Sequence, residues 1–331
     1  MGSPALIVRL RPTGPWRPGS ATGNRDEVDR ILHSDTLYSA MSCAFGDLGL
    51  LPEWLEATAR AEMPAVRLSS AFPFAGRTLL VPAPRNAWPP DSSGKIRWKA
   101  ASFIPASLIG TILSCELPSE ERWVVDPTSQ CLLPIEKNGV VTEPFRIARR
   151  TSAAVDRLTQ SHAHGHPTAC LEFNAGAGLW CVAVFADNSA LEGWGDRIRA
   201  AFRLLADSGL GGERSSGWGC FEQPEFEPVE FPEFIIIPKG SDQPTGYWLW
   251  SLFQPGTADS PDWTAGAYTL TTRSGRVARH GQLKPASRMV EEGSVLASEQ
   301  ALIGAAKDVA PEGAEFPVYR AGFAVALPIP L

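Results

Sequence analysis

The sequence lacks several features that would assign it to a familiar class. Its six cysteines are scattered without any C-x-x-C pair, so we expect reduced thiols rather than a zinc ribbon. Apolar runs such as "EFIIIPK" and "AVALPIPL" are far too short to cross a bilayer. The start "MGSPALIV" has no basic region followed by an apolar segment. We therefore expect a cytoplasmic protein without a membrane role.

Excess positive charge is also missing. Thirty Lys and Arg against 36 Asp and Glu give a net charge of -6, which argues against a free-standing, non-specific nucleic-acid binder. The charges are nevertheless segregated along the chain. Five cations and no acid lie within 273–288, four arginines and one acid within 146–157, and five glutamates within 222–233. Such runs are either solvated loops or local binding patches.

The length of 331 residues favours about two domains, and hydrophobic periodicity predicts their secondary structure. A half-buried strand is expected in "ALIVRLRP", a helix over 34–48 capped by Ser34, a strand pair within 65–84 and a helix over 102–113. A strand in "GLWCVAVFAD", a helix over 189–209 and a short strand in "WGCFE" follow. This order approximates a βαββαβ ferredoxin-like unit with a large insertion, and the chain from 229 onward is mostly strand-like.

The stretch "ADSGLGGERSSGWGCFE" places five glycines, two serines and one arginine between Gly209 and Gly219. Glycine is costly in ordered structure, so a cluster indicates a strained turn or a backbone that a ligand must approach closely. Successive amides in such a loop can bind an anion. A plain glycine-rich turn remains the alternative. The loop follows a helix and lacks G-K-[ST], which disfavours a nucleotide-hydrolysing P-loop.

Six stretches, taken in order, resemble the RAMP superfamily of CRISPR proteins. They are "LHSDTLYSAM", "LSSAFPFAGRTLLVPAP", "ASFIPASLIG", "RRTSAAVDRLTQ…CLEF", "GLGGERSSGWGCFE" and "YTLTTRSGRV…MVEEGSVL", with a closing "PVYRAGFAVALPI". Within the superfamily, the chain is most similar to the Cas5 group that forms the fourth subunit of type III-A (Csm) interference complexes. That subunit holds the 5′ handle of the crRNA. The acidic net charge and the histidine-rich "SHAHGH" turn depart from the pattern.

The resemblance implies an α+β fold of two ferredoxin-like (RRM-like) domains. The first would span 1–228, with an insertion at 85–170, a thumb-like β-hairpin at 140–173 and the glycine-rich loop at 209–219. The second, smaller domain would span 229–331 and be ferredoxin-like or β-rich. The implied role is a non-catalytic, cofactor-free and metal-free crRNA-binding subunit in antiviral defence. It would contact the large Palm-domain (Cas10-type) subunit and the backbone RAMP subunit, and target RNA only indirectly.

The same resemblance implies which residues contact RNA. Arginines of the hairpin and of the glycine loop would bind phosphate, and the serines would add neutral hydrogen bonds. Trp218 would either stack on a base or belong to the core, and His33 would either touch RNA or serve as a capping or core histidine. The full set is His33, Ser34, Arg146, Arg149, Arg150, Arg157, Gly209, Gly211, Gly212, Arg214, Ser215, Ser216, Gly217, Trp218, Gly219, Arg273 and Arg276.

Two other hypotheses stay open on the sequence alone. A metal-independent endoribonuclease of the RAMP superfamily would use His33 or His164 as a general base near an arginine. A metal- or small-molecule-binding α+β protein would use the alternating His162, His164 and His166. No carboxylate or cysteine ligand accompanies these histidines at ligand spacing, so an exposed turn is the preferred interpretation.

Overall fold

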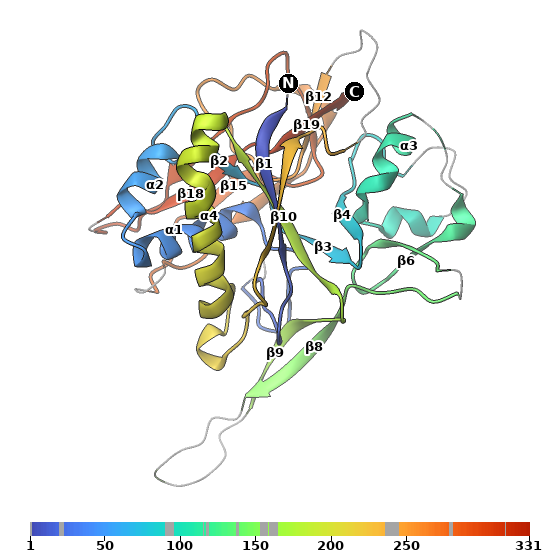
Figure 1. Ribbon diagram of the computed structural model, residues 1–331, viewed down its shortest axis with the longest axis horizontal. Helices are drawn as coiled ribbons and strands as arrows, with labels where there is room; N and C mark the ends of the chain where they lie inside the picture. The colour runs from blue at the N-terminus through green and yellow to red at the C-terminus, as the bar shows by residue number, and fades with distance from the viewer. Residues whose placement is uncertain are drawn as a thin grey trace.

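The structure is a computed structural model, and its main feature is one large antiparallel sheet covered on both faces (Figure 1). It describes residues 2–19, 23–89, 96–114, 116, 119–136, 139–152, 158, 165–235, 245–277, 281–314 and 316–331. The strands of the main sheet are β1 (Ser3–Leu10), β2 (Val66–Leu68), β3 (Phe72–Ala75), β4 (Thr78–Pro82), β5 (Phe103–Pro105), β10 (Ala177–Phe185) and β11 (Glu225–Phe231). The fold is mixed α/β, with many strands and few helices.

The main sheet has the strand order β11–β1–β10–β3–β4–β5, with β2 also paired to β10. Helix α1 (Ser34–Asp47) follows β1 in the chain, and helix α4 (Asn188–Ser208) follows β10. When α2 (Leu51–Ala57), β2 and the elements between β3 and β10 are left out, the succession β1, α1, β3, β10, α4 and β11 has a βαββαβ order, although its last strand is not the one expected from the sequence. Strand β1 lies between β10 and β11 and pairs antiparallel with both.

One face of the sheet is covered by helices. Figure 1 shows α1, α2 and α4 on this side. Leu6 and Val8 of β1 are fully buried in a core with Phe45, Trp54 and Phe202 from the three helices. Full burial of each such aliphatic or aromatic side chain contributes about 1.5–3 kcal/mol. The helices are therefore held on the sheet mainly by this core.

The other face of the sheet is also buried, which the sequence did not predict. Ala5 and Ile7 of β1 are 2% exposed and pack with Trp180, Trp248 and Trp250 in a second core. The expectation of a half-buried β1 was therefore wrong. The second face is covered because C-terminal strands pack against it, and a local alternation pattern cannot show such distant packing.

The C-terminal part consists of strands alone among the described residues from 245 onward. They are β12 (Thr245–Leu249), β13 (Asp262–Ala267), β14 (Leu270–Arg273), β15 (Ser287–Val290), β16 (Val295–Ala297), β17 (Gly304–Asp308), β18 (Tyr319–Phe323) and β19 (Ala326–Pro330). Four of them form the sheet β13–β16–β12–β19, and the pairs β14–β15 and β17–β18 form separate ribbons. This part is β-rich.

Between β4 and β10 the chain forms short elements and one long hairpin. The short ones include α3 (Ile109–Leu113), β6 (Trp123–Val125) and β7 (Leu132–Pro134). Strands β8 (Phe145–Ser152) and β9 (His166–Phe173) pair antiparallel along their whole length and project beyond the sheet in Figure 1. Within the described ranges, no helix is long and apolar enough to span a membrane.

Two further sequence expectations were wrong in detail. The segment 102–113 begins as strand β5, continues as a 3-10 turn and becomes helical only at Ile109. The stretch "WGCFE" is not a strand: only Phe221 forms an isolated bridge, to Pro12. The strand that completes the sheet is instead β11, inside the acidic stretch. Its glutamates are accommodated because Glu227 pairs with Arg9 of β1 at 2.8 Å.

Candidate functional site: a cationic groove beside the glycine loop

A groove of about 250 Å³ lies between the glycine loop, the start of α1 and the C-terminal part. Four cationic side chains among the described residues line it: Arg214, Arg276, Lys284 and Arg320. Asp35 is the one acid among the described residues that line it. The groove therefore brings together cations from stretches that lie far apart in the sequence.

The glycine loop is held against the protein by its own backbone. The N–H of Gly219 donates to the carbonyl of Pro15 at 3.1 Å, and the N–H of Gly212 donates to that of Arg17 at 2.8 Å. Gly211 has a φ of +101°, and a Cβ there would lie 2.3 Å from the Arg17 oxygen. Gly219 has a φ of +79°, and a Cβ there would lie 2.3 Å from the Leu210 oxygen. These glycines are required by the chain's own close packing.

The tip of the loop faces solvent. Arg214, Ser215, Ser216 and Gly217 are exposed, and the first three form a 3-10 turn. Trp218 is half-buried. The loop thus presents one cation and two hydroxyl groups to solvent, and Arg214 also lines the groove.

Two of the cations that line the groove, Arg320 and Lys284, are largely shielded from solvent. The side chain of Arg320 is 3% exposed. Its Nη1 donates to the Pro285 carbonyl and to the Ser287 hydroxyl, both at 2.9 Å. Its Nη2 has no partner within the described part of the chain. Burial lowers the pKa of Arg320 and also that of Lys284, whose Nζ lies 3.5 Å from Ser39 Oγ.

Asp35 already has cationic partners. Arg273 donates to it from Nε at 3.1 Å and from Nη2 at 2.9 Å, and Arg320 Nε lies 3.8 Å away. Burial alone would raise the pKa of Asp35, but the charge and hydrogen bonds of Arg273 outweigh it and the pKa is lowered. One carboxylate thus faces two buried guanidinium groups, and Arg214, Arg276 and Lys284 add further positive charge to the groove.

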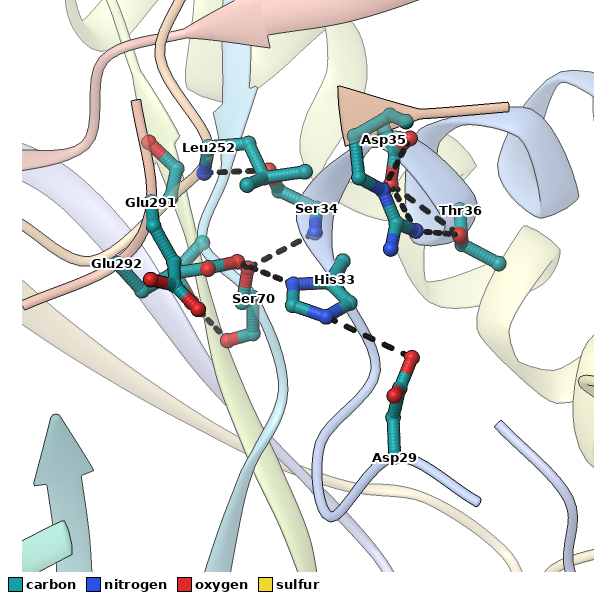
Figure 2. A network of polar contacts seen from close by, with 12 residues as sticks. Asp29, His33, Ser34, Asp35, Thr36, Ser70, Leu252, Glu291 and Glu292 are labelled. Atoms are coloured by element: carbon teal, nitrogen blue, oxygen red, sulfur yellow. Dashed lines mark hydrogen bonds and ion pairs between the residues drawn. The ribbon is translucent and has the colours of Figure 1, made fainter. Parts of the chain in front are cut away.

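A second polar network surrounds the residues before and at the start of α1 (Figure 2). His33 Nδ1 lies 2.9 Å from Glu292 Oε1, and its Nε2 lies 3.7 Å from Asp29. The backbone N–H of Ser34 donates to Ser70 Oγ at 2.8 Å. The Ser34 hydroxyl accepts from the backbone N–H of Leu252 at 3.0 Å.

Several predicted RNA contacts therefore already have partners within the protein. Ser34 does not cap α1: His33 occupies the N-cap position, and the Ser34 side chain bonds to the C-terminal part. Arg273 is committed to Asp35 and Thr36. By contrast, Gly209, Gly211, Arg214 and Arg276 meet in the groove as lining residues.

The hairpin distributes its arginines over two faces. Arg146 and Arg150 lie on one face, and both donate to Glu172, at 2.7 Å for Arg146 Nη2. Arg149 is exposed on the opposite face, because side chains alternate along a strand and Arg149 is an odd number of residues from both of them. Arg157 and the histidines at 162 and 164 lie outside the described residues.

Lys284 and Arg320 were missed as site residues by the sequence analysis. Lys284 belongs to the acid-free stretch 273–288, which was a usable signal. Arg320 lies in β18, and nothing in its local sequence shows that it reaches α1. Among the described residues, no group of three or more His, Cys, Asp or Glu side chains could hold a metal ion.

Comparison with known proteins adds sequence matches. Residues 242–329 match the family model of the CRISPR Csm4 C-terminal domain. The "CRISPR system Cms protein Csm4" of Mycobacterium tuberculosis is 26% identical over 205 residues, 59% of this chain and 56% of that protein. The match thus spans little more than half of that curated relative. The Csm4 of Thermococcus onnurineus is 24% identical over 330 residues, 95% of this chain and 96% of that protein.

Solved structures with the same fold cover nearly the whole chain. A chain of a Csm3–Csm4 subcomplex of a type III-A CRISPR-Cas interference complex aligns with a TM-score of 0.63 and 18% identity, covering 98% of this chain and 99% of that one. A chain of a Csm1–Csm4 cassette crystallised with cA4 aligns with a TM-score of 0.60 and 19% identity, covering 99% and 98%. Taken together, the matches show that the chain is Csm4-like: its C-terminal part matches the Csm4 family model, and its fold is that of chains in solved Csm4 complexes.

Proposed function

We propose that this chain is the subunit of a type III-A (Csm) interference complex that binds the 5′ handle of the crRNA. The observation that carries the proposal is the groove with four cations and one already neutralised acid beside the exposed loop tip. RNA backbone supplies the anions that such a groove favours, and phosphate contacts fix the register of RNA without reading its sequence. That property suits a subunit placed on an invariant handle.

Phosphate would interact with two kinds of cation in the groove. Arg214 is exposed at the loop tip, where a charge-assisted hydrogen bond can form without moving the core. Arg320 Nη2 is buried without a partner in the described part, so a phosphate oxygen would satisfy it. Lys284 also lines the groove and would hold its proton more firmly beside an anion.

In this proposal the β8–β9 hairpin acts as the thumb that contacts the guide. Arg149 is the first phosphate candidate, because its guanidinium lies on the face opposite the Glu172 ion pairs. Arg146 and Arg150 share Glu172, so each of them brings less net positive charge to RNA. The main-sheet unit would be ferredoxin-like, in line with its βαββαβ order.

The partners belong to the same proposal. The structurally similar proteins were solved as a Csm3–Csm4 subcomplex and as Csm1–Csm4 cassettes. We therefore expect a cytoplasmic complex in which this chain connects a large Palm-domain subunit with a backbone RAMP subunit. It would meet target RNA only through the guide.

A non-catalytic role is favoured over RNA cleavage by the position of His33. Its side chain is 13% exposed and lies between Glu292 and Asp29 rather than among the described residues of the groove. A general base must reach the proton that it abstracts. Incubation of the purified chain with repeat RNA tests this point, and cleavage abolished by His33→Ala would support the endoribonuclease alternative.

The test of RNA binding uses the complex co-expressed with its genomic neighbours. Arg214→Ala and Lys284→Ala should each weaken crRNA retention, and to the same extent for guides of different spacer sequence. Removing one phosphate-binding side chain should also reduce the slope of log affinity against log salt by about 0.7, the value for single strands. Arg77→Ala is the matched control, because Arg77 is exposed in the β3–β4 turn away from the groove.

Two results would contradict the proposal. One is that Arg214→Ala and Lys284→Ala both retain as much crRNA as the Arg77→Ala control. The other is a loss that depends on spacer sequence, because handle binding cannot sense the spacer.

A further inference from the structure

A second and larger cavity, of about 470 Å³, is lined in part by His33, the N-cap residue of α1. It is lined by the segment 28–33 before α1, by residues after β4, by residues before β5 and by the turn after β15. None of the four cations of the groove lines it. The volume is in the range of small-molecule sites, about 300–1,000 Å³. We call it the acidic cavity, because Asp29, Glu291 and Glu292 line it.

Glu292 is the most unusual group of this cavity. Its side chain is 2% exposed. Oε1 is used by His33 and Ser70, whereas Oε2 has no hydrogen-bond partner within the described part of the chain. A buried carboxylate oxygen without a donor is costly, so a ligand N–H that reached it would be strongly favoured. Figure 2 shows Glu292 beside Glu291 and His33.

Among the described residues, two aromatic side chains, Trp88 and Phe103, and three cations also line the cavity. Trp88 is half-buried, and one of its faces is stacked on Trp98 at a centroid distance of 5.4 Å. Lys99 is exposed, and Arg30 donates from Nε to the Thr128 carbonyl at 2.7 Å. Arg85 is exposed and pairs with Glu291 at 2.8 Å.

This combination selects among ligand classes. A carboxylate alone would suit a lysine or arginine from a partner protein, but Arg30, Arg85 and Lys99 would repel such a side chain. A simple anion would be repelled by the three acids. A nucleotide satisfies both sets, because its phosphate suits the cations, its base suits an aromatic ring, and an amino group on the base donates to a carboxylate.

We propose that the acidic cavity binds one nucleotide whose base carries an exocyclic amino group, with the base on Trp88, its amino group directed at Glu292 and its phosphate at Lys99. The nucleotide is either free or part of an RNA chain. This cavity is separate from the groove of the proposed function. An experiment can therefore refute nucleotide binding in the cavity without refuting RNA binding in the groove, and the reverse.

The experiment is calorimetric titration of the full chain with CMP, GMP, AMP and UMP. The three amino-bearing nucleotides should bind at least tenfold more tightly than UMP, which has no amino group. Pentamers of cytidylate and uridylate form a second arm. Tight binding of CMP and the cytidylate pentamer alike indicates a site open to free nucleotides, whereas binding of the pentamer alone assigns the ligand to an RNA chain.

Three variants locate the ligand. Trp88→Leu should weaken binding of CMP at least tenfold, because the ring is lost. Lys99→Ala should weaken binding of CMP but leave cytidine unaffected, because only CMP has a phosphate. Glu292→Gln should remove the preference over UMP. Since Glu292 also holds His33, the surface change Lys99→Ala keeps the test valid if Glu292→Gln fails to fold.

Arg214→Ala is the control, because it changes the groove and should leave CMP binding unchanged. UMP binding as tight as CMP binding overturns the proposal. So does absence of binding of every nucleotide and pentamer, or CMP binding that Trp88→Leu and Lys99→Ala leave intact. A preference for a lysine-rich peptide over CMP would assign the cavity to a protein partner instead.

Discussion

Arg273→Met should destabilise the protein severely although Arg273 is far from the main sheet in sequence. Arg273 of β14 and Asp35 of α1 are 10% and 6% exposed and share two hydrogen bonds, at 2.9 and 3.1 Å. The pair joins the C-terminal strands to the helical layer. Removing one partner of a buried ion pair typically costs about 3–5 kcal/mol, because the other charge is left buried.

The structure indicates the lower end of that range. Asp35 would keep Arg320 at 3.8 Å, so its charge would be partly compensated. We expect a loss of about 3 kcal/mol, equivalent to roughly two decades in the unfolding equilibrium. The double variant Arg273→Met/Asp35→Leu should recover part of this loss, because it leaves neither charge of the pair behind, although the buried Arg320 then loses its acid partner.

Urea denaturation followed by fluorescence and by circular dichroism measures the effect, and coincident curves show whether a single free energy applies. Arg9→Met is the control: Arg9 and Glu227 are 23% and 52% exposed, so its removal should cost at most about 1 kcal/mol. The reasoning is refuted if Arg273→Met costs no more than Arg9→Met, or if the double variant is no more stable than the single one.

Three other predictions concern the loop, the histidine and the core. Gly217→Ala should cost about 1–2 kcal/mol for its positive φ alone, whereas Gly219→Ala should cost clearly more in the same denaturation assay, since its Cβ would also meet a carbonyl oxygen at 2.3 Å. Burial lowers the pKa of His33, but the charge of Glu292 outweighs it and the pKa is raised. Stability from this pair should be complete below about pH 6.5 and fall as pH rises through the folded-state pKa, and His33→Gln should flatten that part of the stability–pH curve. Trp54→Ala, at a fully buried position, should cost about 3–5 kcal/mol by the same assay.

Local sequence signals were sufficient to predict the two long helices, α1 and α4. Helix α4 was predicted because its apolar residues recur at helical spacing, and its bounds of 188–208 differ by one residue at each end from the prediction. Asp187 caps it by accepting from the Ala190 N–H at 2.8 Å. The end of α1 was also predicted well, since Gly49 with a φ of +73° follows it. These features depend on neighbours in the sequence.

Long-range contacts account for what the sequence could not show. The Ser34 hydroxyl was expected to cap its own helix, yet it accepts from Leu252, 218 residues away. Arg320 reaches Asp35 only because β18 packs beside α1. The glycine cluster was recognised as a close approach, but that approach at Gly211 is to the chain's own Arg17. Spacing patterns carry no information about partners at such separations.

The start of α1 links both proposed sites to the docking of the C-terminal part. Asp35 lines the groove and is held by Arg273, whereas His33 lines the acidic cavity and is held by Glu292. Arg273 lies in strand β14, and Glu292 lies in the turn after β15, so both belong to the C-terminal part. A substitution that loosens this docking, such as Arg273→Met, should therefore weaken RNA retention and nucleotide binding together. Arg214→Ala should affect only the first, because the loop tip makes no contribution to the lining of the cavity.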